Sequence, residues 1–304
     1  MDIKYKKILS LIVILVLVAL VLYYGNKNIS EFKELEIVNP WLILWLLPLI
    51  FIGLYFGGLN NALPLRASGV YLKNWEIFQL AVITRFYNLI TPFRGGMAIR
   101  ALYLKRKYNF AVTDFFVALS ANYVIIFLVS SLIGIITTYM IYLERGVFSW
   151  VLFLVFLAFF VGMIIIMFSP KLKDRNGRWL GKLFRIINGW HLVKKDPKMV
   201  FGLVLTSTIQ ILLGSLMLWL QFRAFGIEIG FAVALFLNAI ASLSILIGIT
   251  PGNLGVQEAV VVFSAVTIGI TPVESLSTSL LGRAVSLAVL FVLGPLFSWK
   301  LIKK

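Results

Sequence analysis

ITPFRGGMAIR, residues 90–100, interrupts an apolar region with a proline, two glycines and two arginines. A related frame, ITPGNLGVQE, occupies residues 249–258, so the two Thr-Pro pairs lie 159 positions apart (250 − 91). Proline removes a backbone donor and clashes with the preceding helical turn. The sequence therefore predicts two helical segments that are each broken at a Thr-Pro pair.

The composition is typical of a membrane protein. Hydrophobic residues make up 61% of the 304 positions, charged residues make up 13%, and the mean hydropathy is +1.00. A water-soluble fold of this composition would expose large apolar patches. Residues 1–304 are therefore expected to form a single integral membrane domain. The net charge of +16 would indicate nucleic-acid binding in a soluble protein. Here the charge lies in loops between apolar runs, so no nucleic-acid partner is expected.

Apolar runs close to the roughly 20 residues that cross a bilayer predict about six membrane-spanning helices. Two further stretches, about 75–106 and 231–269, contain the Thr-Pro breaks. Each is expected to form a re-entrant helical hairpin, and the alternative is one broken crossing. The predicted fold is an all-α polytopic membrane protein. The first run lacks a small-residue cleavage pattern and is expected to remain as a helix. The six runs are about 8–24, 41–60, 113–141, 147–168, 199–223 and 275–299.

The loop charges predict the topology, because cytoplasmic loops carry the excess of Lys and Arg. With two re-entrant hairpins, 20 basic residues fall on the cytoplasmic side and four fall outside. A multi-pass protein of the cell membrane with both termini in the cytoplasm is therefore expected. The hairpins then enter from opposite sides, which predicts inverted-repeat halves at about 41–141 and 199–300. A basic amphipathic linker, about 169–198, joins them and is expected to lie at the interface or to be a solvated loop.

Four arginines remain within apolar stretches: Arg85, Arg94, Arg100 and Arg283. An arginine at the centre of a membrane helix costs about 2.5–3.5 kcal/mol on insertion scales, so such residues usually face a cavity, a partner or a ligand. A half-helix that begins after the first break directs free N–H groups at that break. Together with arginines, it would suit an anion such as phosphate. The alternative is that these arginines reach the cytoplasmic headgroups or pair with Glu258 to hold the hairpins together.

Glu258 falls in the first turn after the second break, where it is expected to cap the helix. Its second expected role is a gate or coupling group that exchanges arginine partners. The candidate substrate-binding residues are Asn88, Thr91, Pro92, Arg94, Gly95, Gly96, Arg100, Pro251, Gly252, Asn253 and Gly255, and the candidate gate or coupling residues are Glu258, Arg283 and Arg85.

Residues 88–107, NLITPFRGGMAIRALYLKRK, and residues 249–259, ITPGNLGVQEA, resemble the two signature segments of the flippase-like integral membrane family, also called the lysylphosphatidylglycerol synthase transmembrane region family. The resemblance covers nearly the whole chain. Met97 stands where the family often has an acidic residue, and Asn253 where a second glycine is frequent. In two-part bacterial relatives, this membrane region is associated with moving an aminoacylated phospholipid between leaflets, while a soluble domain makes that lipid. This sequence lacks the synthase domain.

The resemblance implies a lipid translocase for an anionic phospholipid or a polyprenyl-phosphate lipid. The alternatives are a membrane-embedded lipid-modifying or glycosyl-transferring enzyme and a small-solute secondary transporter. No catalytic residue, metal or cofactor is expected, because the lone His191 lies in a loop and no closely spaced carboxylate pair with supporting residues occurs. The expected partners are membrane lipids. A homo-oligomer and a partner lipid-modifying enzyme both remain open.

Overall fold

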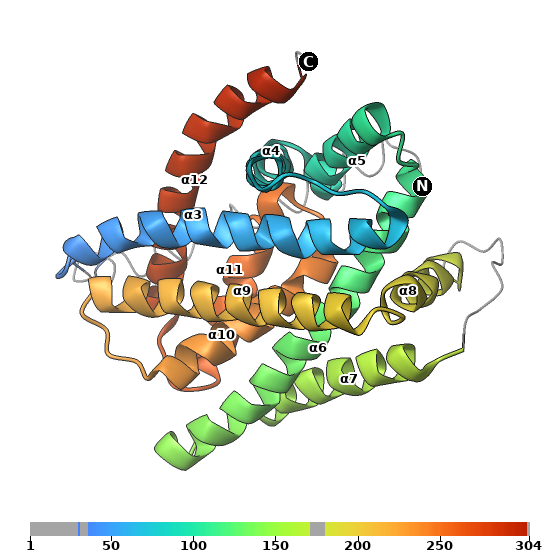
Figure 1. Ribbon diagram of the computed structural model, residues 1–304. Coiled ribbons are helices and arrows are strands. Elements are labelled where there is room, and N and C mark those ends of the chain that lie inside the picture. Colours follow the sequence, from blue (N-terminus) through green and yellow to red (C-terminus); the bar gives the residue numbers. More distant parts are fainter. Residues whose placement is uncertain (1–29, 31–35, 171–179, 303–304) are drawn as a thin grey trace.

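The computed structural model describes residue 30 and residues 36–170 and 180–302, and within these ranges the regular elements are all helical (Figure 1). The longer helices are α3 (Trp41–Ala62), α4 (Asn74–Ile90), α5 (Gly95–Tyr108), α6 (Val112–Arg145), α7 (Trp150–Phe168), α8 (Leu180–Val193), α9 (Pro197–Ala224), α10 (Phe231–Leu243), α11 (Val256–Val266) and α12 (Pro272–Ile302). The short 3₁₀ turns are η1 (Leu63–Ser68), η2 (Pro92–Arg94), η3 (Ser244–Ile247) and η4 (Pro251–Asn253).

Five helical segments in the described part are long and apolar enough to cross a membrane: Trp41–Ser68, Val112–Arg145, Trp150–Phe168, Pro197–Ala224 and Pro272–Leu301. They correspond to five of the six predicted crossings. The sixth, about 8–24, lies outside the described residues. The chain is thus an all-α polytopic membrane protein, as predicted, while the division into one domain with two repeat halves stays a prediction.

Local signals in the sequence explain where these helices begin and end. The Asp196 side chain accepts hydrogen bonds from the backbone N–H groups of Lys198 and Met199, and Pro197 occupies the first helical position of α9. Asp at the N-cap and Pro directly after it are favoured at a helix start. At the C-terminal end of α6, Gly146 ends the helix with a left-handed backbone (φ 69°).

The helix ends group at two opposite ends of the bundle. At the first end, the Asn39 N–H donates to the carbonyl of Ala224 at 3.0 Å, so the start of α3 lies beside the end of α9. At the second end, the Trp190 indole of α8 donates to the carbonyl of Met167 at 3.1 Å, which places α8 at the end of α7. We call these the Asn39 end and the α8 end.

The remaining helices fit the same two ends. Gly189 of α8 lies against the carbonyl of Val117, so α6 begins at the α8 end. Phe297 of α12 packs edge-on against Trp75 at a ring-centroid distance of 5.6 Å. Trp75 lies at the start of α4, which follows the end of α3 and the turn η1 at the α8 end. The helices α3, α7 and α12 therefore run toward the α8 end, while α6 and α9 run away from it.

Both Thr-Pro breaks predicted from the sequence are present. The turn η2 separates α4 from α5, and these two helices pack against each other in a pair that leaves from and returns to the α8 end. The irregular segment 244–255 separates α10 from α11, and this pair begins at the Asn39 end, after α9. The two breaks meet inside the bundle, where Gly252 lies so close to Leu89 that a Cβ would approach the leucine Cδ2 to 2.4 Å.

Two helices outside this centre complete the fold. Only Leu152 and Phe156 of α7 are buried, so most of this apolar helix faces outward, as expected for a helix in contact with lipid. The amphipathic linker contains α8, and its buried Trp190 and Val193 pack with residues of α6 and α9. The first part of the linker, 171–179, lies outside the described residues, and its place at a membrane interface stays a prediction.

Candidate functional site

A cavity of about 520 Å³ lies where the two breaks meet, and every described long helix except α7 and α8 contributes to its wall. Its volume is within the range of about 300–1,000 Å³ that is usual for small-molecule sites. All four arginines that the sequence placed in apolar stretches line it, together with Glu258. With four cationic side chains and one carboxylate, the wall has a formal charge of +3 (4 − 1).

The first break places its arginine through an unusual backbone. Phe93 and Arg94 both have left-handed φ angles, 54° and 58°, which are uncommon for residues other than glycine. Gly95 then begins α5 where a Cβ would clash with the Thr91 hydroxyl at 2.4 Å. The backbone thereby turns sharply enough to direct Arg94 into the cavity.

Arg94 is held by protein groups. One guanidinium nitrogen donates to the Tyr123 hydroxyl at 2.7 Å, and another donates to the carbonyl of Ile245. Gly248 leaves room for the guanidinium, because a Cβ there would lie 2.6 Å from the arginine Nε. Arg94 thus connects the first break to α6 and to the irregular segment between α10 and α11. It does not pair with Glu258.

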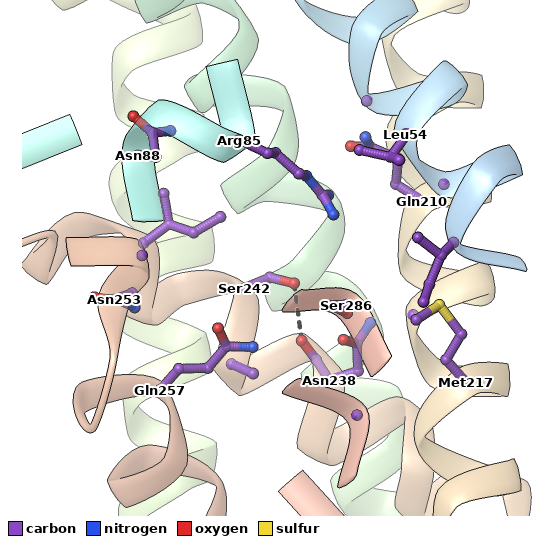
Figure 2. A pocket seen from close by; sticks show the side chains of 18 of the residues that line it. Leu54, Arg85, Asn88, Gln210, Met217, Asn238, Ser242, Asn253, Gln257 and Ser286 are labelled. Carbon is purple, nitrogen blue, oxygen red and sulfur yellow. Dashed lines mark hydrogen bonds between the residues drawn. The ribbon is translucent and has the colours of Figure 1, made fainter. Parts of the chain in front are cut away.

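Arg100 has a different environment. Its side chain is 1% exposed, and neither Nε nor Nη2 has a hydrogen-bond partner among the described residues. A buried cation without partners is costly, so Arg100 requires a hydrogen-bond partner that the described residues do not supply. Arg85 also has no ion pair or hydrogen bond within the described part of the chain, and Figure 2 shows its side chain extending from α4 into the cavity.

The second break, like the first, contains residues with a left-handed backbone. Gly252 and Asn253 have φ angles of 58°, and Gly255 has a φ of 78° at the start of α11. Glu258 caps that helix by accepting a hydrogen bond from the Gly255 N–H at 2.7 Å. Its other oxygen accepts from Nε of Arg283 in an ion pair, so the predicted cap and the predicted arginine partner are both present.

The predicted site residues divide into two groups. Thr91, Pro92, Gly95, Gly96, Pro251 and Gly255 shape the breaks without lining the cavity, whereas the other predicted residues line it: Arg85, Asn88, Arg94, Arg100, Gly252, Asn253, Glu258 and Arg283. Gly96 shows the shaping role most clearly, since a Cβ there would lie 2.0 Å from the carbonyl of Thr84 and would separate α5 from α4. Whether these residues bind a substrate or form a gate stays a prediction.

Sequence reasoning missed most of the uncharged polar wall. Tyr123 and a set of amide side chains line the cavity beside the arginines, and Figure 2 shows Asn238 and Gln257 across the space from Arg85. The available signal was amide residues at positions within otherwise apolar helices, where an unsatisfied polar group is costly. The missed amides are Asn61, Asn122, Gln210, Gln221, Asn238 and Gln257.

A second polar cluster connects the start of α4 to the end of α5. The buried carboxylate of Glu76 accepts hydrogen bonds from Tyr103 at 2.6 Å, Lys107 at 2.9 Å and Tyr108 at 2.8 Å. Burial raises the pKa of Glu76, but these hydrogen bonds and the charge of Lys107 outweigh burial and hold that pKa below its usual value. Burial and the Glu76 carboxylate raise the pKa of Tyr108 to about 12.

These features define the class of protein: a polytopic integral membrane protein with an arginine-lined cavity at the meeting point of two broken helices. The chain belongs to the lysylphosphatidylglycerol synthase TM region family, whose profile matches residues 7–294. It is also 23% identical over 327 aligned positions to a UPF0104 membrane protein of Methanothermobacter thermautotrophicus, in a comparison that covers 96% of this chain and 94% of the relative. The family predicted from the two signature segments is therefore confirmed.

Proposed function

We propose that this protein is a lipid translocase that moves an anionic phospholipid or a polyprenyl-phosphate lipid between membrane leaflets. The observation that carries the proposal is the buried guanidinium of Arg100, whose Nε and Nη2 have no partner in the described part of the chain, in the wall of a cavity with an excess of positive charge. Arginine suits phosphate through its planar set of donors. Arg100 and Arg85 would hold the phosphate, Arg94 would contribute from its fixed position, and the acyl chains would remain in lipid.

The proposal includes the membrane arrangement. The two broken pairs act as re-entrant hairpins that enter from opposite leaflets, which is a recurrent transporter plan with binding near mid-membrane. The α8 end lies in the cytoplasm of a cell-membrane protein with both termini inside. In support, basic residues concentrate at that end, where Lys105, Lys107 and Lys198 lie, whereas Arg145 and Arg223 end α6 and α9 at the Asn39 end.

Glu258 and Arg283 would act as the gate. Their ion pair bridges α11 and α12 next to the second break, and Arg283 also donates to the carbonyl of Gly252 at 3.1 Å. An exchange of arginine partners by Glu258 would alter the contacts between the two broken pairs. A two-state element of this kind can alternate the side from which the cavity opens.

The proposed activity changes no covalent bond. The test uses purified full-length protein in liposomes that contain acyl-chain-labelled phosphatidylglycerol, with dithionite added outside to quench the outer leaflet. The proposal expects quenching beyond the half seen in protein-free liposomes, and it expects the lipid to be recovered chemically intact. A modified lipid would favour the enzyme, and quenching no greater than in empty liposomes would contradict translocation.

A further inference from the structure

The cavity holds unused hydrogen-bond acceptors as well as unused donors. Asn122 on α6 is 1% exposed and lines the cavity, and its Oδ1 has no hydrogen-bond partner among the described residues. Its Nδ2 donates to Oδ1 of Asn61 at 3.4 Å, while Asn61 itself donates to the carbonyl of Gly57 at 2.7 Å. A carbonyl only accepts, so this chain of bonds fixes which amide atom of Asn122 is the unpartnered oxygen.

Asn253 at the second break presents another such oxygen. Its Nδ2 donates to the backbone carbonyl of Ser244 at 3.3 Å and to the Ser244 hydroxyl at 3.0 Å. That hydroxyl already donates to Ala241, so it serves Asn253 only as an acceptor. The Oδ1 of Asn253 is therefore fixed as an acceptor, and it is buried without a partner in the described part of the chain.

Asn238 on α10 is a further amide residue of the cavity wall. Its Nδ2 donates to the carbonyl of Ile211 at 2.9 Å, and the side chain lines the cavity (Figure 2). Among the described residues, the buried and unpartnered oxygens of Asn122 on α6 and Asn253 in η4 thus share one space with Arg100, whose Nε and Nη2 also have no partner there. A bare anion would satisfy the arginine, but it has no hydrogen atoms to offer the amide oxygens.

The charge of the cavity determines which kind of hydrogen-bond donor on a ligand suits the amide oxygens. Hydroxyl and ammonium groups both donate hydrogen bonds. Glu258, the carboxylate of the described cavity wall, is already paired with Arg283, and the phosphate of the headgroup offsets only part of the charge of the remaining three arginines. An incoming ammonium would therefore still face a net positive wall. Like charges within one poorly hydrated space repel strongly. A neutral hydroxyl avoids that repulsion.

We infer that the cavity selects a phosphate ester whose headgroup carries neutral hydroxyl groups, such as glycerol, inositol or a sugar, over headgroups that carry an ammonium. This selectivity rests on the proposed function, since the amide oxygens specify the headgroup only after the arginines hold its phosphate. Affinity comes from Arg100 and Arg85, and specificity comes from Asn122 and Asn253.

The test measures binding of four lipids to the detergent-purified full chain by native mass spectrometry: phosphatidylglycerol, phosphatidylinositol, phosphatidylserine and phosphatidic acid. Phosphatidylglycerol and phosphatidylserine carry the same net charge, so their ratio isolates the headgroup. We expect the two hydroxyl-bearing lipids to bind at least about threefold more tightly than phosphatidylserine, as one or two net hydrogen bonds would give. Equal binding of phosphatidylglycerol and phosphatidylserine would overturn the selectivity and leave translocation standing, whereas no binding of any anionic lipid would overturn both.

Free glycerol 3-phosphate, added as a competitor, separates the two sources of this chemistry. Displacement of phosphatidylglycerol only at large excess supports a lipid headgroup. Displacement at equal concentration supports the same hydroxyl-bearing phosphate in soluble form and contradicts the translocase.

Variants assign the selectivity to the named oxygens. Asn122→Leu removes the oxygen at similar size, and Asn253→Gly removes it while keeping a residue that tolerates the left-handed backbone. In either variant, the ratio of the affinity for phosphatidylglycerol to the affinity for phosphatidylserine should fall toward one. The affinity for phosphatidic acid should fall less. Asn39→Leu makes the same chemical change outside the cavity and should keep the wild-type preference. A wild-type preference in both cavity variants would overturn the assignment.

Discussion

Glu258 on α11 and Arg283 on α12 form an ion pair directly beside the second helix break, and the same carboxylate caps α11 through the Gly255 N–H. Cap and ion pair use different oxygens of Glu258, since Oε2 accepts from Gly255 and Oε1 accepts from Arg283. The two roles can therefore be separated by a substitution that keeps one amide oxygen and removes the charge.

Glu258→Gln is expected to fold and to lose lipid transfer. The cap should survive with a loss of about 1 kcal/mol or less. The uncompensated Arg283 biases the protein toward one state, so transfer in liposomes should slow at least roughly tenfold, about 1.4 kcal/mol in the barrier. The matched control is Glu274→Gln, because Glu274 caps α12 through the Thr271 N–H in the same way but is only partly buried and has no arginine partner among the described residues. Wild-type transfer by Glu258→Gln would reduce this residue to a helix cap.

Arg94→Leu should lower thermal stability, whereas Arg100→Leu should not. In lipid-free detergent, Arg100→Leu removes a buried charge that has no partner among the described residues, and it should leave the stability unchanged or higher. Arg94→Leu breaks the bonds to Tyr123 and Ile245 and should cost about 1–3 kcal/mol. Added phosphatidylglycerol should then raise the melting temperature of the wild type by mass action but not that of Arg100→Leu. An equal stabilising response in both proteins would contradict a phosphate site at Arg100.

Cysteines placed at the two bundle ends should be labelled from opposite sides. The chain has no native cysteine, so Lys105→Cys and Arg145→Cys each report one position. In oriented membranes, a membrane-impermeant maleimide should reach residue 145 from outside and residue 105 only from the cytoplasm. External labelling at residue 105 would rule out the re-entrant arrangement of the α4–α5 pair.

The Glu76 cluster predicts a stability contribution that disappears in acid. The folded-state pKa of Glu76 lies below its usual value, so the contribution is fully present above the unfolded pKa of about 4.5 and is lost as pH falls through the folded pKa. Glu76→Gln should therefore lower the stability at pH 7 by about 1–3 kcal/mol. Thermal unfolding from pH 7 to pH 3 should show the gap between the two proteins closing below about pH 4.5. A gap that stays constant to pH 3 would argue against an ionised Glu76 in the cluster.

The helix breaks and the arginine-lined site were predictable because they rest on local chemistry. Proline and glycine at 92, 95, 251 and 252 predict irregular backbone wherever they occur, and an arginine in an apolar run is conspicuous in any fold. That Glu258 pairs with an arginine was predictable for the same reason, since few opposite charges are available within the apolar stretches, but several arginines remained open as the partner.

The state of each arginine was not predictable, because it depends on contacts between distant segments. Arg94 is tied to a carbonyl 151 positions away, and the left-handed backbone that directs it occurs at Phe93 and Arg94, whose residue types rarely adopt it. The amide side chains that line the cavity were not predictable for the same reason. The bond between Asn122 and Asn61 spans 61 positions, and only the packing of α6 beside α3 places the free oxygen in the cavity.

Transfer of acyl-labelled phosphatidylglycerol by Arg100→Leu, at matched incorporation into liposomes, tests the central claim most directly. The comparison protein is Arg145→Leu, which makes the same substitution at an exposed helix end outside the cavity. The account predicts that Arg145→Leu transfers lipid at the wild-type rate, whereas Arg100→Leu is slower by at least roughly tenfold, as the loss of one charge-assisted bond would give. Equal transfer by Arg100→Leu, Arg145→Leu and the wild type would contradict the claim that the cavity carries the lipid phosphate.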